Sequence, residues 1–282
     1  MPRFALVIVA LVTALAACTS RSQDVTSAAP MTGGDPKDGQ QIYISLGDSY
    51  ATGFSPVGNG ESFADIIAKR EGLNLVNLAC NGVTSGELLT EPACGPEAEG
   101  RSQVDATVAQ LRTGRVGLVT LVIGGNDLVE PCAVAENPLE CAKGALTDTK
   151  TNISTVLTRI REAAPDVKVV GLTYPDVFLG AWVNPAFPNG EELARSSVSL
   201  YEDFNGEMAA EYAKFGAKFA DITKTTGGYG ALTELTEHPK YGQIPASVAE
   251  VCTLTYFCDQ SDVHPTPAGH QAIAEAIMAA SR

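Results

Sequence analysis

The sequence is poor in basic and aromatic side chains and lacks a long apolar segment. Its 282 residues include 19 lysines and arginines against 33 acidic residues, a formal net charge of −14, and only 6% are aromatic. A chain this acidic repels phosphates, which argues against a nucleic-acid-binding protein. The apolar stretch from Phe4 to Leu15 is shorter than the roughly 20 residues of a typical transmembrane helix.

The composition also excludes disordered, collagen-like and very small disulfide-rich proteins. Hydrophobic residues make up 45% of the chain and charged residues 18%, which is typical of a globular protein with a buried core. A chain of this length forms one or two domains, and α/β folds of this size often form one. We therefore expect one large domain.

The N-terminus has the pattern of an export signal. Arg3 precedes the apolar stretch, and the small residues Ala16 and Ala17 precede Cys18, as in secretory signals. The Leu15-Ala16-Ala17-Cys18 segment resembles a bacterial lipoprotein box, in which cleavage precedes the cysteine and its sulfur carries a lipid. This predicts a lipid anchor at Cys18. The alternative is ordinary cleavage near Ala17, which leaves Cys18 as an incidental thiol.

A polar segment connects this cysteine to the rest of the chain. Residues 19 to 40 are rich in Ser, Thr, Gly, Asp and Pro, a composition that cannot bury a core and is typical of a flexible tether. The predicted organisation is a signal peptide over 1–17, a tether over 18–40 and one domain over 41–282. The protein is then expected at the outer face of the cell membrane, held by its acyl chains and not by electrostatic attraction, or secreted if the lipoprotein box is not used.

Seven cysteines are present, without any Cys-x-x-Cys pair. Six of them form couples that are close in sequence: Cys80 and Cys94, Cys132 and Cys141, and Cys252 and Cys258. In an oxidising compartment these couples favour three disulfides between neighbours, although other connectivities are possible. A zinc site is the competing interpretation, and the irregular spacings argue against it. The odd cysteine is then Cys18.

Beyond the tether, short apolar runs alternate with longer segments of helical period. The runs predict strands over Ile42–Leu46, Leu73–Leu78, Leu118–Ile123, Val167–Leu172 and Lys218–Ile222. Apolar residues near i, i+3, i+4 and i+7 predict helices over Ser62–Arg70, Val104–Leu111, Thr147–Ala163, Glu191–Phe215 and Pro267–Ala280. Nearly continuous apolar strands between helices indicate a parallel sheet that is buried on both faces. The sequence therefore predicts an α/β protein with a three-layer α/β/α sandwich.

Polar residues suited to catalysis follow the first three predicted strands. In such folds ligands gather outside the carboxyl ends of the strands, and these ends carry Ser49, Gly82 and Asn126. A serine in a small-residue turn can present its hydroxyl to a base, while a glycine amide and an asparagine side chain can donate to an oxyanion. His264 lies in a loop before the last predicted helix and suits a general base. Taken singly, each of these residues also suits a turn, a helix cap or the surface.

In order and spacing these blocks resemble those of the SGNH (GDSL-type) hydrolase family. The matching segments are Gly47-Asp48-Ser49, Gly82, Gly124-x-Asn126-Asp127 and His264-Pro265. The resemblance covers residues 42 to 280 and implies a flavodoxin-like sandwich with a five-stranded parallel sheet. It also implies that Ser49 is the nucleophile, that His264 is the base, and that Ser49, Gly82 and Asn126 form the oxyanion hole. The flanking residues are similar to those of the secreted, disulfide-bearing branch known for lipases and esterases.

The sequence leaves open which group orients His264. The family's usual acid lies three residues before the histidine, where this chain has Ser261, while Asp262 and Asp259 lie two and five residues before it. Either carboxylate or the main-chain carbonyl of Ser261 could orient the imidazole. We favour Asp262; the alternative role for Asp262 is to cap the following helix.

Together the blocks predict a carboxylic ester hydrolase that forms an acyl-enzyme and needs no metal or cofactor. Small esters or lipids are the expected substrates, and the protein is expected to be a monomer with no nucleic-acid partner. Two alternatives are a carbohydrate esterase that deacylates envelope polysaccharide and a weakly active surface lipoprotein that uses the pocket for binding. The aromatic segment from Tyr174 to Pro188 either covers the substrate site or packs its own loop onto the body.

Overall fold

The structure, a computed structural model of the whole chain, describes residues 39–128 and 138–282. The predicted signal peptide, Cys18 and nearly all of the predicted tether lie outside these residues, as does Cys132.

A five-stranded parallel sheet forms the centre of the molecule, in the order β2-β1-β3-β4-β5. Its strands are β1 (Ile42–Gly47), β2 (Asn74–Asn77), β3 (Val116–Val122), β4 (Lys168–Leu172) and β5 (Lys218–Ala220). Each lies within two residues of a predicted run at either end. Strand β5 ends two residues early because Asp221 caps a short helix: its side chain accepts a hydrogen bond from the backbone N–H of Lys224.

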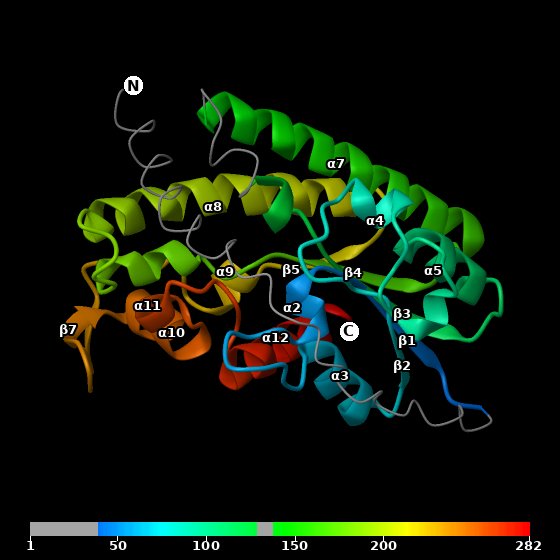
Figure 1. Cartoon of the computed structure of the whole chain (residues 1–282), viewed down its shortest axis with the longest axis horizontal. Coiled ribbons are helices and arrows are strands. Elements are labelled where there is room, and N and C mark those ends of the chain that lie inside the picture. Colours follow the sequence, from blue (N-terminus) through cyan, green and yellow to red (C-terminus); the bar gives the residue numbers. More distant parts are fainter. Residues whose placement is uncertain (1–38, 129–137) are drawn as a thin grey trace.

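Helices cover both faces of the sheet, which confirms the predicted α/β/α sandwich (Figure 1). One face carries α5 (Gln103–Leu111), α7 (Pro138–Ala163) and α8 (Gly190–Ala213), and the other carries α3 (Phe63–Glu71) and α12 (Pro267–Ala280). Two apolar clusters result. Alternate β1 residues divide between them: Ile42, Ile44 and Leu46 pack towards α5 and α7, and Tyr43 packs towards α3 and α12. Residues i and i+2 of a strand point to the same face, so a strand buried on both sides reads as a continuous apolar run.

Shorter helices and a hairpin lie outside the three main layers. They are α2 (Ser49–Thr52), α4 (Glu87–Thr90), η1 (Pro96–Ala98), η2 (Val177–Trp182), α9 (Ile222–Thr225), α10 (Ala246–Leu254), α11 (Phe257–Gln260) and an antiparallel hairpin of β6 (Leu235–His238) and β7 (Gly242–Pro245). The hairpin, α10 and α11 lie together at one end of the molecule in Figure 1. With η2 they bury their own small apolar clusters, and they lead the chain into the His264 loop. The periodicity of the sequence did not predict these elements.

Disulfides join neighbouring cysteines as the sequence predicts. Cys80 is bonded to Cys94 and Cys252 to Cys258, with 5.3 Å between the Cα atoms in each pair. Cys141 also forms a disulfide, and its predicted partner Cys132 lies outside the described residues. The Cys80–Cys94 and Cys252–Cys258 bonds join residues 14 and 6 positions apart, so they chiefly restrain local conformation.

Within residues 39–128 and 138–282, no helix has both the length and the apolar character needed to cross a membrane.

The contact between α3 and α12 buries His270. The side chain is 3% exposed, its Nδ1 accepts a hydrogen bond from the backbone N–H of Phe63 at 3.3 Å, and its Nε2 has no partner among the described residues. Burial lowers the pKa of this imidazole to about 4, and the proximity of His264 adds to the shift. His270 is therefore neutral in the folded protein at neutral pH.

Protonation of His270 is expected to destabilise the fold. Its folded pKa of about 4 lies below the ordinary 6.5, so the unfolded chain takes up the proton first as pH falls. The stability that neutral His270 supports is complete above pH 6.5 and declines, by about 3 kcal/mol, as pH falls to 4. His270→Asn retains an acceptor for Phe63 without titrating. In urea denaturation, the free energy of unfolding of this variant should vary less with pH between 6.5 and 4 than that of the wild type.

The pH dependence of the variant must be compared with that of the wild type, because buried carboxyl groups titrate in the same pH range and also change the free energy of unfolding. Burial raises the pKa of Asp48 to about 6 and that of Asp176 to about 7, and both groups oppose the effect of His270 as pH rises. They are present in wild type and variant alike. Equal pH slopes for the two proteins would contradict the assignment to His270.

Candidate active site

Ser49 lies just after the carboxyl end of the interior strand β1, as the first residue of the four-residue helix α2. The Asp48 side chain caps this helix by accepting a hydrogen bond from the N–H of Tyr50 at 3.0 Å. Gly47, just before them, has φ +134°, and a Cβ atom there would lie 2.0 Å from the carbonyl oxygen of Val122. Only glycine fits at this point, because a side chain would collide with the β3 backbone. The turn that carries Ser49 therefore follows directly from Gly47.

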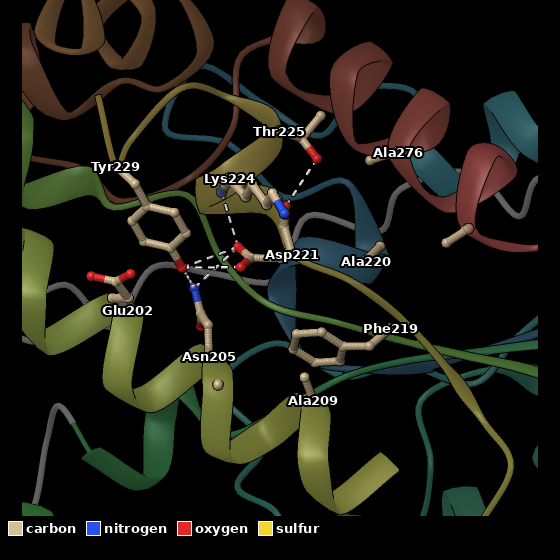
Figure 2. Close-up of a pocket in the computed structure, with 12 residues that line it drawn as sticks. Glu202, Asn205, Ala209, Phe219, Ala220, Asp221, Lys224, Thr225, Tyr229 and Ala276 are labelled. Carbon is tan, nitrogen blue, oxygen red and sulfur yellow. Dashed lines mark hydrogen bonds between the residues drawn. The ribbon is translucent and has the colours of Figure 1, made fainter. Parts of the chain in front are cut away.

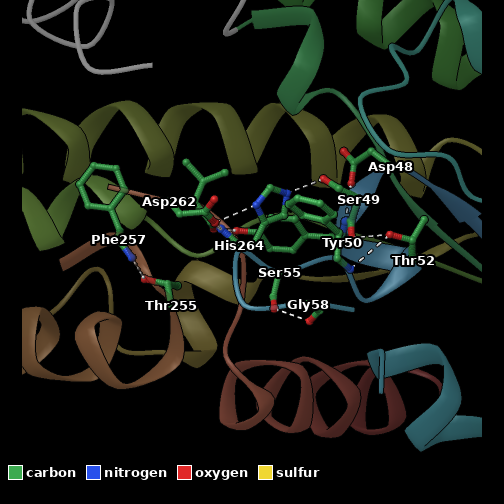
Figure 3. A network of polar contacts seen from close by, with 12 residues as sticks. Asp48, Ser49, Tyr50, Thr52, Ser55, Gly58, Thr255, Phe257, Asp262 and His264 are labelled. Atoms are coloured by element: carbon green, nitrogen blue, oxygen red, sulfur yellow. Dashed lines mark hydrogen bonds and ion pairs between the residues drawn. The ribbon is translucent and has the colours of Figure 1, made fainter. Parts of the chain in front are cut away.

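A hydrogen-bonded chain connects Ser49, His264 and Asp262 (Figure 3). His264 Nε2 lies 2.8 Å from Ser49 Oγ, and His264 Nδ1 lies 2.8 Å from Asp262 Oδ1. The same carboxylate oxygen accepts the backbone N–H of His264 at 2.9 Å. Asp262 therefore holds both the backbone and the ring of His264. A carboxylate on Nδ1 selects the tautomer whose Nε2 can accept the serine proton.

The other two groups that the sequence left open are not on the imidazole. Asp259 accepts hydrogen bonds from Lys240 Nζ and from the Tyr241 hydroxyl, both from the β6–β7 hairpin. These bonds, with that of Lys240 first, lower the pKa of Asp259. Ser261 has a left-handed backbone with φ +54°, and its hydroxyl accepts a hydrogen bond from Asn184 at 3.0 Å. Among the described residues, Asp262 alone is hydrogen-bonded to His264 Nδ1.

The capping alternative for Asp262 does not hold. Helix α12 begins at Pro267, and its N-cap is Thr266, whose side chain accepts from the N–H of Gly269. Asp262 lies four residues before this cap, and its carboxylate bonds to His264 instead.

Two aromatic residues of the Ser49 segment hold the histidine loop in place. The Tyr50 hydroxyl donates to the carbonyl oxygen of Val263, the residue before His264. The half-buried ring of Phe54 meets the imidazole edge-on, with 4.6 Å between the ring centroids. The nucleophile and the base are therefore connected by backbone and ring contacts as well as by their own hydrogen bond.

The hydroxyl of Tyr174 joins the ends of β1 and β3. It donates to Asp48 Oδ2 and accepts the backbone N–H of Gly125 at 3.1 Å. Asp48 is 2% exposed, and burial raises its pKa to about 6 although the bonds from Tyr174 and Tyr50 act in the opposite direction. Asp48 thus has a structural hydrogen-bonding role beside Ser49, and it is Asp262 that contacts the imidazole.

The loops that carry the predicted oxyanion donors are bonded to each other. Gly82 lies in an exposed turn with φ +75°. The Asn126 amide donates to the carbonyl oxygen of Val83 at 2.9 Å, and the Asp127 carboxylate accepts from both the backbone N–H and the hydroxyl of Ser85. A side-chain amide carries two N–H groups, so the bond to Val83 leaves one of them for an oxyanion.

Gln103 is a site-positioning residue that the sequence analysis missed. It is 1% exposed, its Oε1 accepts the N–H of Gly47 at 2.8 Å, and its Nε2 donates to the carbonyl oxygen of Gly47 at 2.9 Å. Both polar groups of the glycine before Asp48 are thereby satisfied inside the protein. A glutamine at the start of a helix gives no sequence signal for such a contact, because its partner lies 56 residues away.

The aromatic segment after β4 packs onto the body of the protein. Phe178 and Phe187 are each 8% exposed, and their rings lie 5.7 and 5.3 Å from that of Phe257. Trp182 is half-buried, with the guanidinium of Arg195 over its ring at 4.6 Å. Of the two roles that the sequence allowed for this segment, these contacts support packing.

A cavity of about 570 Å³ opens elsewhere, between α8, the end of β5 and α12 (Figure 2). Its polar wall is internally bonded: Asn205 Nδ2 donates to the Tyr229 hydroxyl at 2.8 Å, and this hydroxyl donates to Asp221 at 3.0 Å. None of the predicted site residues lines it. In the part of the chain that the structure describes, no group of three or more His, Cys, Asp or Glu side chains could hold a metal ion.

Residues 45–272 match the model of the GDSL-like Lipase/Acylhydrolase family. The chain belongs to this family. The matched segment contains Ser49, His264 and every other residue of the predicted site, and the observed sheet has the five parallel strands that the resemblance to this family implied.

Two solved structures of Streptomyces enzymes share the fold. The chain is similar to the extracellular lipase of Streptomyces rimosus, with 20% identity and a TM-score of 0.58 over 85% of this chain and 99% of the lipase. It is also similar to phospholipase A1 of Streptomyces albidoflavus NA297, with 17% identity and a TM-score of 0.55 over 86% of this chain and 99% of that one. No curated protein sequence matches the chain.

Replacing Asp262 should affect turnover far more than replacing Asp259. Asp262→Asn removes the charge that selects the tautomer and stabilises the imidazolium, so kcat for p-nitrophenyl acetate should fall by about 10⁴-fold. Asp259→Asn changes the same functional group three residues away, where it contacts Lys240 and Tyr241, and should change kcat only a few-fold. If Asp262→Asn retained most of the activity, a main-chain carbonyl would be the orienting group.

Proposed function

We propose that this protein is a serine carboxylic ester hydrolase, an esterase or lipase, that works through an acyl-enzyme on Ser49. The observation that carries the proposal is the pair of 2.8 Å contacts that connect Ser49 Oγ, His264 and Asp262. A serine hydroxyl is a weak nucleophile unless a base removes its proton, and this arrangement supplies that base together with a group that orients it. Ser49 comes from the end of β1, and His264 and Asp262 come from the loop before α12, so the fold brings together residues that are far apart in sequence.

Acylation begins at the Ser49 hydroxyl. His264 Nε2 takes the proton as Oγ attacks the ester carbonyl, and the carbonyl π electrons move to its oxygen. Collapse of the tetrahedral intermediate breaks the bond to the alcohol, which leaves with the proton from His264. The acyl group stays on Ser49, and Asp262 stabilises the imidazolium that exists between the two proton transfers.

The negative charge on the former carbonyl oxygen needs donors. We assign this role to the backbone N–H groups of Ser49 and Gly82 and to the second N–H of the Asn126 amide. The bonds from Asn126 to Val83 and from Ser85 to Asp127 support this assignment because they hold the two loops together before substrate arrives. Preorganised donors of this kind need no rearrangement as charge develops.

Deacylation repeats these steps with water. His264 accepts a proton from water, the hydroxide attacks the acyl carbonyl, and the proton returns to Ser49 Oγ as the acid leaves. Both half-reactions require neutral His264.

For the substrate we propose lipid or small acyl esters. The two Streptomyces enzymes with similar folds are a lipase and a phospholipase A1, which makes lipid esters the first class to test. The half-buried Phe54 ring beside His264 adds apolar surface next to the reacting atoms, and an acyl or alkyl group would bind there more readily than a polar sugar.

We also propose that the protein is exported and lipid-anchored through Cys18. The sequence of the N-terminus carries this proposal, and the disulfides Cys80–Cys94 and Cys252–Cys258 support it, because such bonds persist in oxidising compartments. Anchoring and catalysis are separate proposals, and each can fail without the other.

Labelling with a fluorophosphonate probe tests the catalytic proposal. The probe reacts with activated serines, so wild-type protein should carry one adduct, on Ser49 by peptide mass spectrometry, and Ser49→Ala should carry none. Ser55→Ala is the matched control and should leave labelling unchanged, because among the described residues Ser55 Oγ bonds only to the carbonyl oxygen of Gly58. A folded wild-type protein that takes no label would favour the binding lipoprotein instead.

A substrate panel separates esterase, lipase and carbohydrate esterase. We expect hydrolysis of p-nitrophenyl esters to exceed that of acetylated xylan or arabinan, measured as kcat/KM and as released acetate. Preference for acyl chains of eight or more carbons would identify a lipase, and preference for shorter chains an esterase. Faster deacetylation of the polysaccharides would overturn the proposed substrate class while leaving the Ser49 mechanism intact.

A further inference from the structure

A group of basic side chains without ion-pair partners lies at the edge of the sheet where the strands begin. Many exposed basic residues pair with carboxylates, as Lys150 does with Glu207 at 2.9 Å, whereas Arg112, Arg115 and Lys224 have no carboxylate within ion-pair distance among the described residues. Within residues 39–128 and 138–282, no carboxylate lies within ion-pair distance of four others: Arg161, Lys168, Lys218 and Arg282. We call these four residues the basic edge.

All four residues of the basic edge line one cavity of about 390 Å³. They come from the last turn of α7, the first residues of β4 and β5, and the segment after α12. In a parallel α/β fold the helices end where the strands begin, so residues far apart in sequence meet there. Asp166 is the one carboxylate side chain among the residues that line this cavity. Basic side chains therefore outnumber acidic ones at this cavity, in a protein whose net charge is −14.

Arg161 provides a fixed charge in the wall of this cavity. Its half-buried guanidinium donates to the carbonyl oxygens of Phe215 at 2.8 Å, Val167 at 2.7 Å and Pro165 at 3.2 Å. These acceptors are neutral, so they hold the side chain in place without cancelling its charge. A positioned guanidinium of this kind suits a phosphate or carboxylate.

The helix dipole accounts for only part of the basic edge. A cation in the last turn of a helix offsets the negative C-terminal end, which explains Arg161 at the end of α7. Lys168 and Lys218 belong to strands, each as the exposed first residue of its strand. Their strands are neighbours in the sheet, with Val170 paired to Lys218. These two lysines need another explanation.

The chain enters the fold at the same edge. Strand β1 begins at Ile42, whose N–H donates to the carbonyl oxygen of Arg115 just before β3. The segment that precedes Ile42, with the proposed anchor Cys18, therefore joins the domain on the side of the basic edge. Ser49 lies at the other end of β1. The basic edge therefore lies on the side of the sheet where the chain enters the domain, and the active site lies on the opposite side.

We propose that the basic edge is a docking surface for a membrane that contains anionic phospholipid, with a headgroup phosphate in the 390 Å³ cavity. The net charge of −14 predicts repulsion from such a membrane, and this local surface reverses the interaction where the chain meets it. Docking in this orientation directs Ser49 away from the bilayer. The proposal is independent of the chemistry at Ser49.

Vesicle co-sedimentation at low salt tests this surface with the full chain. Wild-type protein should bind phosphatidylglycerol–phosphatidylcholine vesicles more tightly than pure phosphatidylcholine vesicles. The double variant Lys168→Gln/Lys218→Gln should bind the anionic vesicles about 25-fold more weakly, since one basic residue near an anionic bilayer changes affinity about fivefold. Added sodium chloride should reduce the difference. The N-terminal segment is the same in both proteins, so it cannot produce the difference.

Lys150→Gln/Lys224→Gln is the matched control, with the same net charge. Lys150 lies mid-way along α7, and Lys224 lies in α9 beyond the carboxyl end of β5. This control should bind as the wild type does. An equal loss of vesicle binding in both double variants would show that only net charge matters. Unchanged binding by Lys168→Gln/Lys218→Gln would show that the basic edge does not bind the membrane. Either result overturns the proposal. Hydrolysis of a soluble ester should be unchanged in all of these proteins, which separates this proposal from that for Ser49.

Discussion

The N–H and carbonyl groups of Gly47 are held by the side chain of one buried glutamine, and the rest of the site depends on that contact. Gly47 ends a strand that is buried on both faces, so its polar groups cannot reach water and must bond inside the protein. Gln103 bonds to both, the backbone N–H of Cys80 also donates to the carbonyl oxygen of Gly47 at 3.1 Å, and the carbonyl oxygen of Val122 leaves no space for a side chain at this point. The chain therefore turns sharply after β1, and Ser49 is presented at the start of a single helical turn. The hydrogen bond between Ser49 and His264 depends on this turn, because the turn sets the position of the serine.

The loop that brings His264 to the serine is restrained from several directions. Tyr50 holds the carbonyl of Val263, Asp262 holds both the backbone and the ring of His264, and the Cys252–Cys258 bond closes the helical segment just before the loop. Each contact alone is worth little against the entropy of an irregular segment. Together they keep the imidazole within hydrogen-bonding distance of Ser49 before any substrate binds, which removes an ordering step from catalysis.

Local sequence patterns predicted the features that depend on neighbours in the chain. Apolar runs located the five strands, because a strand buried on both faces is apolar at nearly every position. Helical periods located the main helices, because a helix buried along one stripe is apolar at every third or fourth position. Ser49, Gly82 and Asn126 were predicted as site residues because they follow these runs, His264 because it lies before the last helix, and all four because they match a family pattern. Gln103 and Tyr174 were missed as positioning residues, since their partners, Gly47 and Asp48, are distant in sequence and neither contact leaves a periodic signal. The choice among Asp262, Asp259 and the Ser261 carbonyl likewise depended on tertiary contacts.

The β6–β7 hairpin shows how a remote element can decide which acid serves a histidine. Two carboxylates lie within five residues of His264, and the hairpin binds one of them through Lys240 and Tyr241. The loop then has a single carboxylate available to the imidazole, although that residue lies one position away from the usual place in the family. Where other contacts bind the neighbouring carboxylates, the residue that supplies the acid can change position in the sequence while its hydrogen bond to the histidine ring is kept. The hairpin and the catalytic loop are therefore expected to diverge together among relatives, as a coupled pair.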